Sequence, residues 1–350
     1  MRDVDAHPEM GVRNSQPAGI GRVVALGDGC AWNNLGRNVV FASRAFEPRA
    51  VFDQTQYPDD DELSQYDFDV HAILDVRDAG VVVVLNHLGI LRGFRRSEID
   101  APGAVRRIDP VWMRTFAADV ERVVAVGARL VGSRPREQRA GGVLVSEPVA
   151  AAADGTPLDA GVELGSWNMV TALDRFQVDG RDCIAVGGDG QVALAPIDGG
   201  HVGPLRWEVG VDFEPAAFAW DGRVLWAAGP DLGAAGIDDY DWEKLRGGGF
   251  AALQPSDGGA VLRSRFARDP AWGSGGTAVV VAPGVVCAIG RTGVLEVYGT
   301  HGGARRSPTV GLAPRSLGIA HAAVVRDTLL FGFNRGGYRL HAVPVSALAR

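Results

Sequence analysis

Two histidines open similar stretches that lie far apart in the chain. One stretch runs from His71 to Asn86 and the other from His321 to Asn334. In each, the histidine begins an apolar run, an Arg-Asp turn follows, and a second apolar run ends at asparagine. Imidazole is both a general base and a common metal ligand, so a fold that brings His71 and His321 together would give the protein a site for chemistry.

Three further polar residues occupy comparable places at the start of other apolar runs. They are Asn33 after Trp32, Asn168 after Trp167, and Glu214. Imidazole and carboxylate suit Zn²⁺, Mn²⁺ or Fe²⁺, whereas amide oxygens with a carboxylate suit Ca²⁺. The set of His71, His321, Asn33, Asn168 and Glu214 therefore predicts one divalent metal ion. Such an ion would acidify its bound water for hydrolysis or lactone opening, with Glu214, His71 or His321 as the catalytic base.

A second interpretation of these polar residues is structural. Buried backbone N–H and C=O groups need partners, and polar side chains that recur at equivalent positions commonly supply them. The sequence leaves both interpretations open.

The elements that position these residues are short strands. Apolar runs with a period of two, bounded by Gly, Asp, Asn or Pro, recur throughout the 350 residues, and no window has helical spacing with caps. Repeated meanders of this kind predict an all-β fold, a β-propeller with a period of ~45 residues and most simply seven four-stranded blades. Six or eight blades also fit. The first strand of each blade lines the central channel, where residues distant in sequence converge.

The ends of the chain are expected to close this ring. Residues 319–325, 328–334 and 338–345 supply three strands of a final blade, and we expect Gly21–Gly27 to join them as the fourth. Closure by an N-terminal strand removes an exposed sheet edge. The predicted organisation is a flexible tail at 1–18 and a single propeller domain at 19–350.

Two hairpins carry a resemblance to known propellers. Residues 250–262 resemble the strand pairs of quinoprotein-like repeats, and residues 188–200 resemble the same hairpin in WD40-type repeats. The converging polar residues also resemble the central metal site of gluconolactonase-like propellers, and Phe213-Glu214-Pro215 matches a fragment of the opening motif of that family. This resemblance implies a propeller with a metal in its channel.

An insertion at 230–249 is too long for an ordinary hairpin connection. It holds Tyr240 and Trp242 between carboxylates, and aromatic residues in such surroundings favour a lid or a contact with a partner.

Charge and cysteine content narrow the classes of partner. The net charge of -7 argues against a nucleic-acid partner, because an acidic surface repels phosphates. No run of about 18 apolar residues indicates a membrane span. Three widely separated cysteines form neither a disulfide framework nor a metal motif, so we expect a cytoplasmic protein with buried thiols.

A run of arginines is a further candidate for binding. The cluster comprises Arg92, Arg95, Arg96, Arg106 and Arg107. It could hold an acidic partner or an anionic ligand, or it could be a solvated blade edge that discourages pairing with another sheet.

Two functions follow from the sequence. The first is a propeller that binds a small molecule or a protein partner through its central channel and one loop face. The alternative is a metal-dependent hydrolase, lactonase or lyase that uses the converging histidines, asparagines and glutamate.

Overall fold

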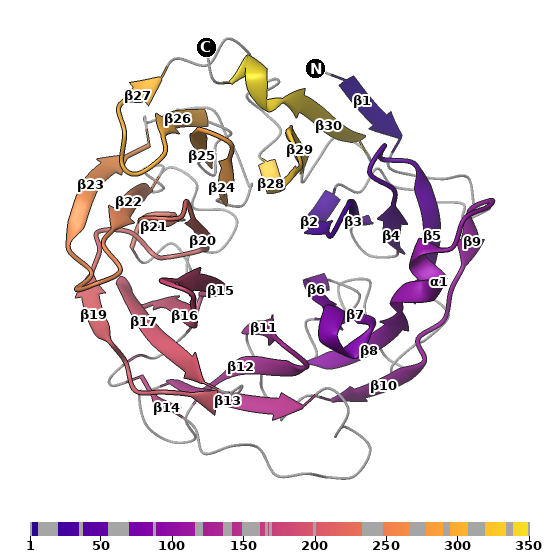
Figure 1. The fold of residues 1–350 in the computed structure, drawn as a ribbon, viewed down its shortest axis with the longest axis horizontal. Helices are drawn as coiled ribbons and strands as arrows, with labels where there is room; N and C mark the ends of the chain where they lie inside the picture. The colour runs from indigo at the N-terminus through magenta and orange to yellow at the C-terminus, as the bar shows by residue number, and fades with distance from the viewer. Residues whose placement is uncertain are drawn as a thin grey trace.

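Short apolar runs separated by tight turns make the protein an all-β β-propeller, as seen in a computed structural model. The structure describes residues 2–5, 20–34, 38–54, 70–86, 89–115, 122–135, 142–148, 162–164, 167, 170–198, 201–232, 248–266, 278–289, 295–306, 319–333 and 339–348. In these residues the strands form seven sheets that follow one another around a ring (Figure 1). The prediction of an all-β propeller is confirmed.

The first three sheets come from the N-terminal part of the chain. The first sheet holds β2 (Ile20–Leu26), β3 (Gly29–Asn34), β4 (Asn38–Ala42), β5 (Pro48–Asp53) and β9 (Arg106–Arg107). The second holds β6 (Val70–Val76), β7 (Val81–Asn86), β8 (Ile90–Arg95) and β10 (Trp112–Thr115). The third holds β11 (Arg122–Val126), β12 (Arg129–Pro135), β13 (Gly142–Pro148) and β14 (Val162–Glu163).

The other four sheets complete the chain. The fourth holds β15 (Ala172–Val178), β16 (Arg181–Gly188), β17 (Gln191–Asp198), β18 (His201–Val202) and β19 (Trp207–Gly210). The fifth holds β20 (Ala217–Trp220), β21 (Leu225–Gly229), β22 (Gly249–Leu253) and β23 (Ala260–Arg265). The sixth holds β24 (Ala278–Ala282), β25 (Val285–Ile289), β26 (Leu295–Gly299) and β27 (Arg305–Arg306). The seventh holds β28 (Ile319–Val325), β29 (Thr328–Phe333), β30 (Arg339–Pro344) and β1 (Arg2–Asp5).

Helical structure in the described residues is limited to short turns. They are α1 (Arg96–Asp100) and the 3₁₀ turns η2 (Arg77–Ala79) and η6 (Val345–Ala347). None of the described helices has the length and apolar character that a membrane-spanning helix requires.

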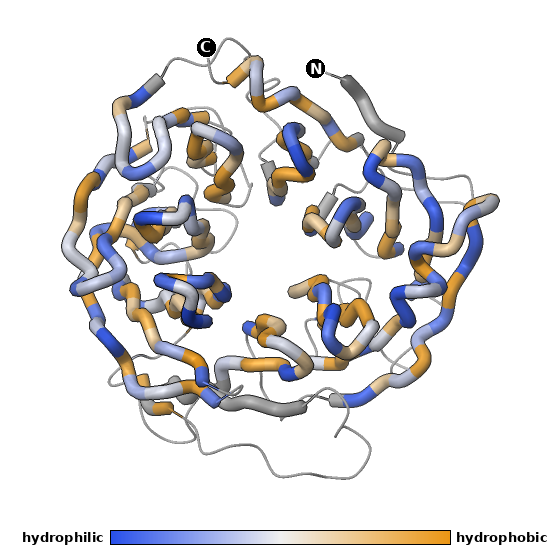
Figure 2. Tube along the Cα trace, viewed as in Figure 1, coloured by the Kyte–Doolittle hydropathy of each residue, from blue (hydrophilic) through white to orange (hydrophobic). Residues whose placement is uncertain are grey.

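The hydrophobic core is divided among the seams between sheets. Each cluster of buried apolar residues joins two neighbouring sheets, and one cluster joins the seventh sheet to the first through residues such as Leu330 and Trp32. Both faces of the middle strands are therefore apolar, as β7 shows with six buried residues in succession. Apolar segments accordingly recur in every sheet (Figure 2).

Tight turns connect the strands because the sequence supplies residues that tolerate positive φ. Asp189 and Gly190, between β16 and β17, have φ values of 50° and 69°. Two successive residues with positive φ are the requirement of a type I′ turn, whose twist matches that of the strands it joins.

The strand predicted to complete the final blade belongs elsewhere. Residues 20–26 form β2, which pairs with β3 and is the innermost strand of the first sheet. The prediction for Gly21–Gly27 was wrong because the apolar pattern of a strand shows that it is buried but not which strand it pairs with. The same pattern fits the final blade and the first sheet equally well. Strand β1 instead pairs with β30 in an antiparallel register, with Val4 opposite Leu340. This strand lies within the predicted tail, whose residues 6–18 lie outside the described residues.

A close backbone approach within the fifth sheet, between the end of β21 and the segment that leads into β20, generates a prediction of stability. A Cβ atom added to Gly229, at the end of β21, would lie 1.6 Å from the backbone oxygen of Glu214, whereas one added to Gly210, at the end of β19, meets nothing within 4 Å. We expect Gly229→Ala to lower the free energy of unfolding by about 1–3 kcal/mol, because backbone must move to admit the methyl group. Urea unfolding measures the change, and Gly210→Ala should lie within about 0.5 kcal/mol of wild type. Equal stability of the two variants would contradict the packing described.

Candidate functional site

The inner strands of the seven sheets surround a cavity of about 410 Å³ on the axis of the ring. Every sheet contributes to its lining through its innermost strand, that is β2, β6, β11, β15, β20, β24 and β28. Most lining residues are apolar. The polar and charged ones are Arg22, His71, Arg122, Thr171, Asp174 and His321.

The structure brings His71 and His321 to the same cavity, as their repeated sequence context predicts. His71 is the extra residue of a β-bulge, because Val70 pairs with Asn86 and the next pair is Ala72 with Leu85. A similar irregularity precedes His321 in β28. Bulges re-aim side chains and are frequent next to functional sites, so these strand starts are shaped for more than regular pairing.

Two arginines that the sequence analysis missed share this cavity with the histidines. Arg22 Nε donates to the carbonyl oxygen of Val70 in the next sheet, at 3.4 Å, and Arg122 Nε donates to the carbonyl oxygen of Thr171, also in the next sheet, at 2.9 Å. Both guanidinium groups are thus oriented across a seam by a backbone oxygen. A neutral carbonyl orients a guanidinium without cancelling its charge.

The signal for these arginines is present in the sequence. The segment Arg22-Val-Val-Ala-Leu-Gly27 is repeated as Arg122-Val-Val-Ala-Val-Gly127. In both copies the backbone N–H of the arginine donates a hydrogen bond to a polar side chain eleven residues later in the sequence. The acceptor is Asn33 in the first sheet and Ser133 in the third.

The arginines change the chemistry of His321. The pKa of His321 is lowered well below its usual range, first by burial and then by the positive charges of Arg22 and Arg122. The imidazole is therefore neutral at neutral pH, and both arginines lie close enough to act on it. The cavity has a positive potential at this point.

Asp174, in β15, is a second titratable residue that the sequence analysis missed. Burial raises the pKa of its carboxyl to about 7, while the backbone N–H of Arg175, which donates to Asp174 Oδ1 at 2.7 Å, opposes this shift. Carboxyl groups that titrate near neutral pH are uncommon in proteins, and those that occur are concentrated at functional sites. The sequence gives no signal for it, since a lone aspartate in a strand is usually solvated.

Glu214 does not line the cavity and is occupied by structural hydrogen bonds. Its carboxylate accepts from the backbone N–H groups of Asp189 at 3.0 Å and Gly190 at 3.2 Å, and from Thr171 Oγ1 at 2.9 Å. Burial nevertheless raises its pKa. Glu214 therefore clamps the turn of the fourth sheet to the fifth sheet, which supports the structural interpretation for this residue.

Asn33, the remaining predicted site residue that the structure describes, does not line the cavity. Asn33 lies in β3, one strand outward, because β2 occupies the innermost place that the sequence analysis gave to the Asn33 strand. Its buried Oδ1 accepts the backbone N–H of Arg22. Asn168, Tyr240 and Trp242 lie outside the described residues.

The described residues contain no group of three or more His, Cys, Asp or Glu that could hold a metal ion. Of the predicted ligands among the described residues, His71 and His321 alone line one cavity. The cysteines in this part of the chain, Cys30, Cys183 and Cys287, are buried and free, as predicted. Burial raises the pKa of Cys30 and Cys287 to about 12, so both are protonated thiols.

Comparisons with known proteins support the fold alone. No protein-family model matches the chain, and no curated protein matches it. Among solved structures, 1119 chains match. One is the crystal structure of the computationally designed Ika8 protein, with a TM-score of 0.56 and 12% sequence identity, covering 96% of this chain and 86% of that chain. The likeness supports the β-propeller fold.

The hydrogen bonds of Glu214 generate a test of its role. We expect Glu214→Ala to lower the free energy of unfolding by about 2–4 kcal/mol, because two backbone N–H groups and a hydroxyl lose their acceptor in a buried seam. Glu214→Gln, which keeps an oxygen acceptor, should lose less. Chemical denaturation measures both values. Wild-type stability of Glu214→Ala would show that the clamp is unimportant.

The raised pKa of the half-buried Asp174 carboxyl generates a prediction of pH dependence. Its pKa is about 7 in the folded protein against 3.8 in the unfolded chain, so folding takes up a proton between these values and stability falls as pH rises through 7. Asp174→Asn lacks this dependence. The stability of wild type relative to Asp174→Asn should therefore fall by about 2 kcal/mol between about pH 5.5 and about pH 8.

Urea unfolding at both pH values measures the difference. The matched control is Asp198→Asn, because Asp198 is exposed in β17 and its surroundings change little on folding. A constant difference between wild type and Asp174→Asn would contradict the assignment.

Proposed function

We propose that the protein binds a small anionic molecule, such as an organic acid, in its central channel. The observation that carries this proposal is the approach of Arg22 and Arg122, from sheets that are not neighbours, to His321 at one cavity. Guanidinium groups recognise carboxylates by paired, charge-assisted hydrogen bonds. A bound anion relieves the repulsion that two arginines would otherwise exert in a confined space.

The remaining lining suits such a ligand. The volume of about 410 Å³ falls in the range of small-molecule sites. The apolar side chains, among them Val24, Ile73 and Phe218, exclude water from a ligand and strengthen its electrostatic contacts. The neutral imidazole of His321 adds one group that donates and one that accepts a hydrogen bond, and His71 adds a second imidazole to the lining, which favours a ligand with both kinds of polar atom.

Asp174 makes this binding depend on pH. When its carboxyl is ionised, above about pH 7, the cavity holds a negative charge that opposes an anion. When it is protonated, the opposing charge is lost. We therefore expect tighter anion binding on the acidic side of neutrality.

We infer that the ring has seven blades and that β1 closes it. The seven sheets of the described residues support this count, together with the apolar cluster that packs the seventh sheet on the first. Pairing of β1 with β30 supports closure, because it joins the two ends of the chain in one sheet. A crystal structure that traces every strand tests both statements.

The metal-dependent enzyme has less support. Its proposed base, Glu214, is held by three donors in a seam, and its two histidines share the cavity lining with two arginines and a single carboxyl, that of Asp174. The positive charge of the arginines disfavours binding of a metal cation in the same cavity. A partner surface on the 230–249 insertion remains a prediction.

The test uses malonate as the probe and the His321 ring as the reporter. Histidine signals are followed by NMR during pH titrations with and without malonate, and His321→Gln identifies the signal. We expect malonate to raise the pKa of His321, because the anion offsets the charges of Arg22 and Arg122. Arg122→Gln should itself raise that pKa and weaken malonate binding at least about tenfold.

The matched control is Arg223→Gln, which removes the same charge from an exposed turn between β20 and β21. It should respond to malonate as wild type does. If malonate leaves the His321 signal of folded wild-type protein unchanged, the proposed function is wrong.

A further inference from the structure

A second cavity, of about 740 Å³, lies in the seam between the first and second sheets. Its lining comes from the β2–β3 turn, the β4–β5 turn, η2 and α1. It lies beyond the end of β2, whereas Arg22 of the channel lies near the start of that strand. The two cavities are therefore separate sites at opposite ends of one strand.

The floor of this seam cavity is apolar and its walls are basic. Buried side chains of Leu26, Cys30, Val82 and Ile99 belong to the floor. The basic residues are Arg44, Arg49, Arg77 and Arg96. Only Arg96 belongs to the arginine cluster noted in the sequence; Arg44 comes from the β4–β5 turn, Arg49 from the start of β5 and Arg77 from η2.

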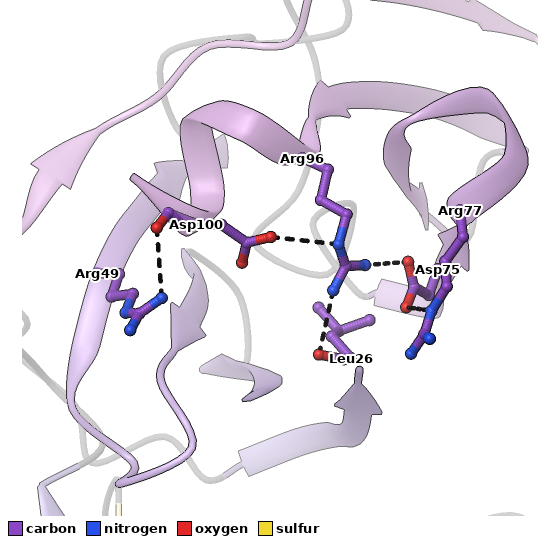
Figure 3. A network of polar contacts seen from close by, with 6 residues as sticks. All are labelled: Leu26, Arg49, Asp75, Arg77, Arg96 and Asp100. Carbon is purple, nitrogen blue, oxygen red and sulfur yellow. Dashed lines mark hydrogen bonds and ion pairs between the residues drawn. The ribbon is translucent and has the colours of Figure 1, made fainter. Parts of the chain in front are cut away.

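The carboxylates near the cavity are already engaged. Asp75 binds both Arg77, at 2.9 Å, and Arg96, and Asp100 binds Arg96 Nε at 3.2 Å (Figure 3). Asp28 lies 3.3 Å from Arg326 of the seventh sheet. Arg96 is thereby fixed between Asp75 and Asp100, and it also donates to the backbone oxygen of Leu26 at 3.4 Å.

Two arginines keep their charge uncompensated. Arg49 donates to the backbone oxygen of Asp100 at 3.4 Å, and neither Arg49 nor Arg44 makes an ion pair within the described residues. The guanidinium groups of Arg77 and Arg96 share Asp75, so arginines exceed carboxylates around the cavity. Arg96 is held in place by its ion pairs, whereas Arg44 and Arg49 keep donors that can bind a ligand.

The glycines of the β2–β3 turn keep the space open. A Cβ atom on Gly27 would lie 2.7 Å from Arg96 Nη2 and 3.0 Å from Arg77 Nη2, and Gly27 has a φ of 59° that disfavours other residues. The turn therefore approaches the two guanidinium groups as closely as a backbone can.

We propose that this seam cavity binds a small molecule that carries two or more phosphate or carboxylate groups. Arg44 and Arg49 bind one anionic group from the first sheet, while Arg77 and Arg96 face the other from the second sheet. The volume and the apolar floor accommodate the body of the ligand. A site of this kind bridges two sheets, so its ligand strengthens their seam.

The experiment uses isothermal titration calorimetry with two probes, pyrophosphate and tricarballylate. We expect saturable binding of at least one probe, and binding at least tenfold weaker in the double variant Arg44→Ala/Arg49→Ala. These two residues make a single hydrogen bond to the rest of the described chain, so the variant is expected to fold. The single variant Arg44→Ala, at an exposed position, gives an intermediate loss.

Arg223→Ala is the charge control, since it removes an equal charge from an exposed position in the β20–β21 turn of the fifth sheet. Preference for pyrophosphate assigns a phosphate ligand, and preference for tricarballylate assigns a carboxylate ligand. Absence of saturable binding of either probe, or equal affinity in the double variant and the Arg223→Ala control, would overturn the proposal.

Discussion

The inner edge of every sheet imposes the constraint on which the rest of this structure depends. The innermost strand of a sheet pairs on one side only, so the backbone groups on its other side face the axis and need partners. Side chains from the neighbouring sheet supply them at several seams. Arg22 reaches Val70, and Arg122 reaches Thr171 in the same manner. Glu214 reaches back to the fourth sheet and holds its turn. The same contacts that satisfy the backbone therefore fix each sheet against the next.

This constraint explains why structural and functional roles fall on the same residues. A guanidinium that bonds a carbonyl oxygen stays charged, so two seam contacts also place two positive charges on the axis. Burial, together with these two charges, lowers the pKa of His321. Glu214 is the opposite case, because its carboxylate is consumed by the contacts that it makes and has little capacity for a ligand. Whether an inner residue is available for binding thus depends on how much of its hydrogen-bonding capacity the seam uses.

The sequence predicted the propeller and the meeting of the two histidines because both depend on local patterns. Apolar alternation and glycine turns define hairpins, and the copies that begin at His71 and His321 mark equivalent hairpins, β6–β7 and β28–β29. It misplaced Asn33 because the pattern of a strand does not state which neighbour it pairs with. It missed Asp174 because the raised pKa comes from burial among distant strands. The repeated Arg-Val-Val-Ala segments were a readable signal for Arg22 and Arg122.

The charge distribution reconciles an acidic protein with two basic cavities. The net charge of -7 is spread over the whole chain, whereas the arginines of the channel and of the seam cavity gather where sheets meet. Fields from surface charges are screened within about 10 Å at ordinary ionic strength, but those inside a cavity are screened much less. A small anion that enters a cavity meets the local arginines together with the few carboxylates of the lining. We therefore propose small anions, rather than nucleic acid, as ligands, on the basis of where the charges lie rather than of their sum.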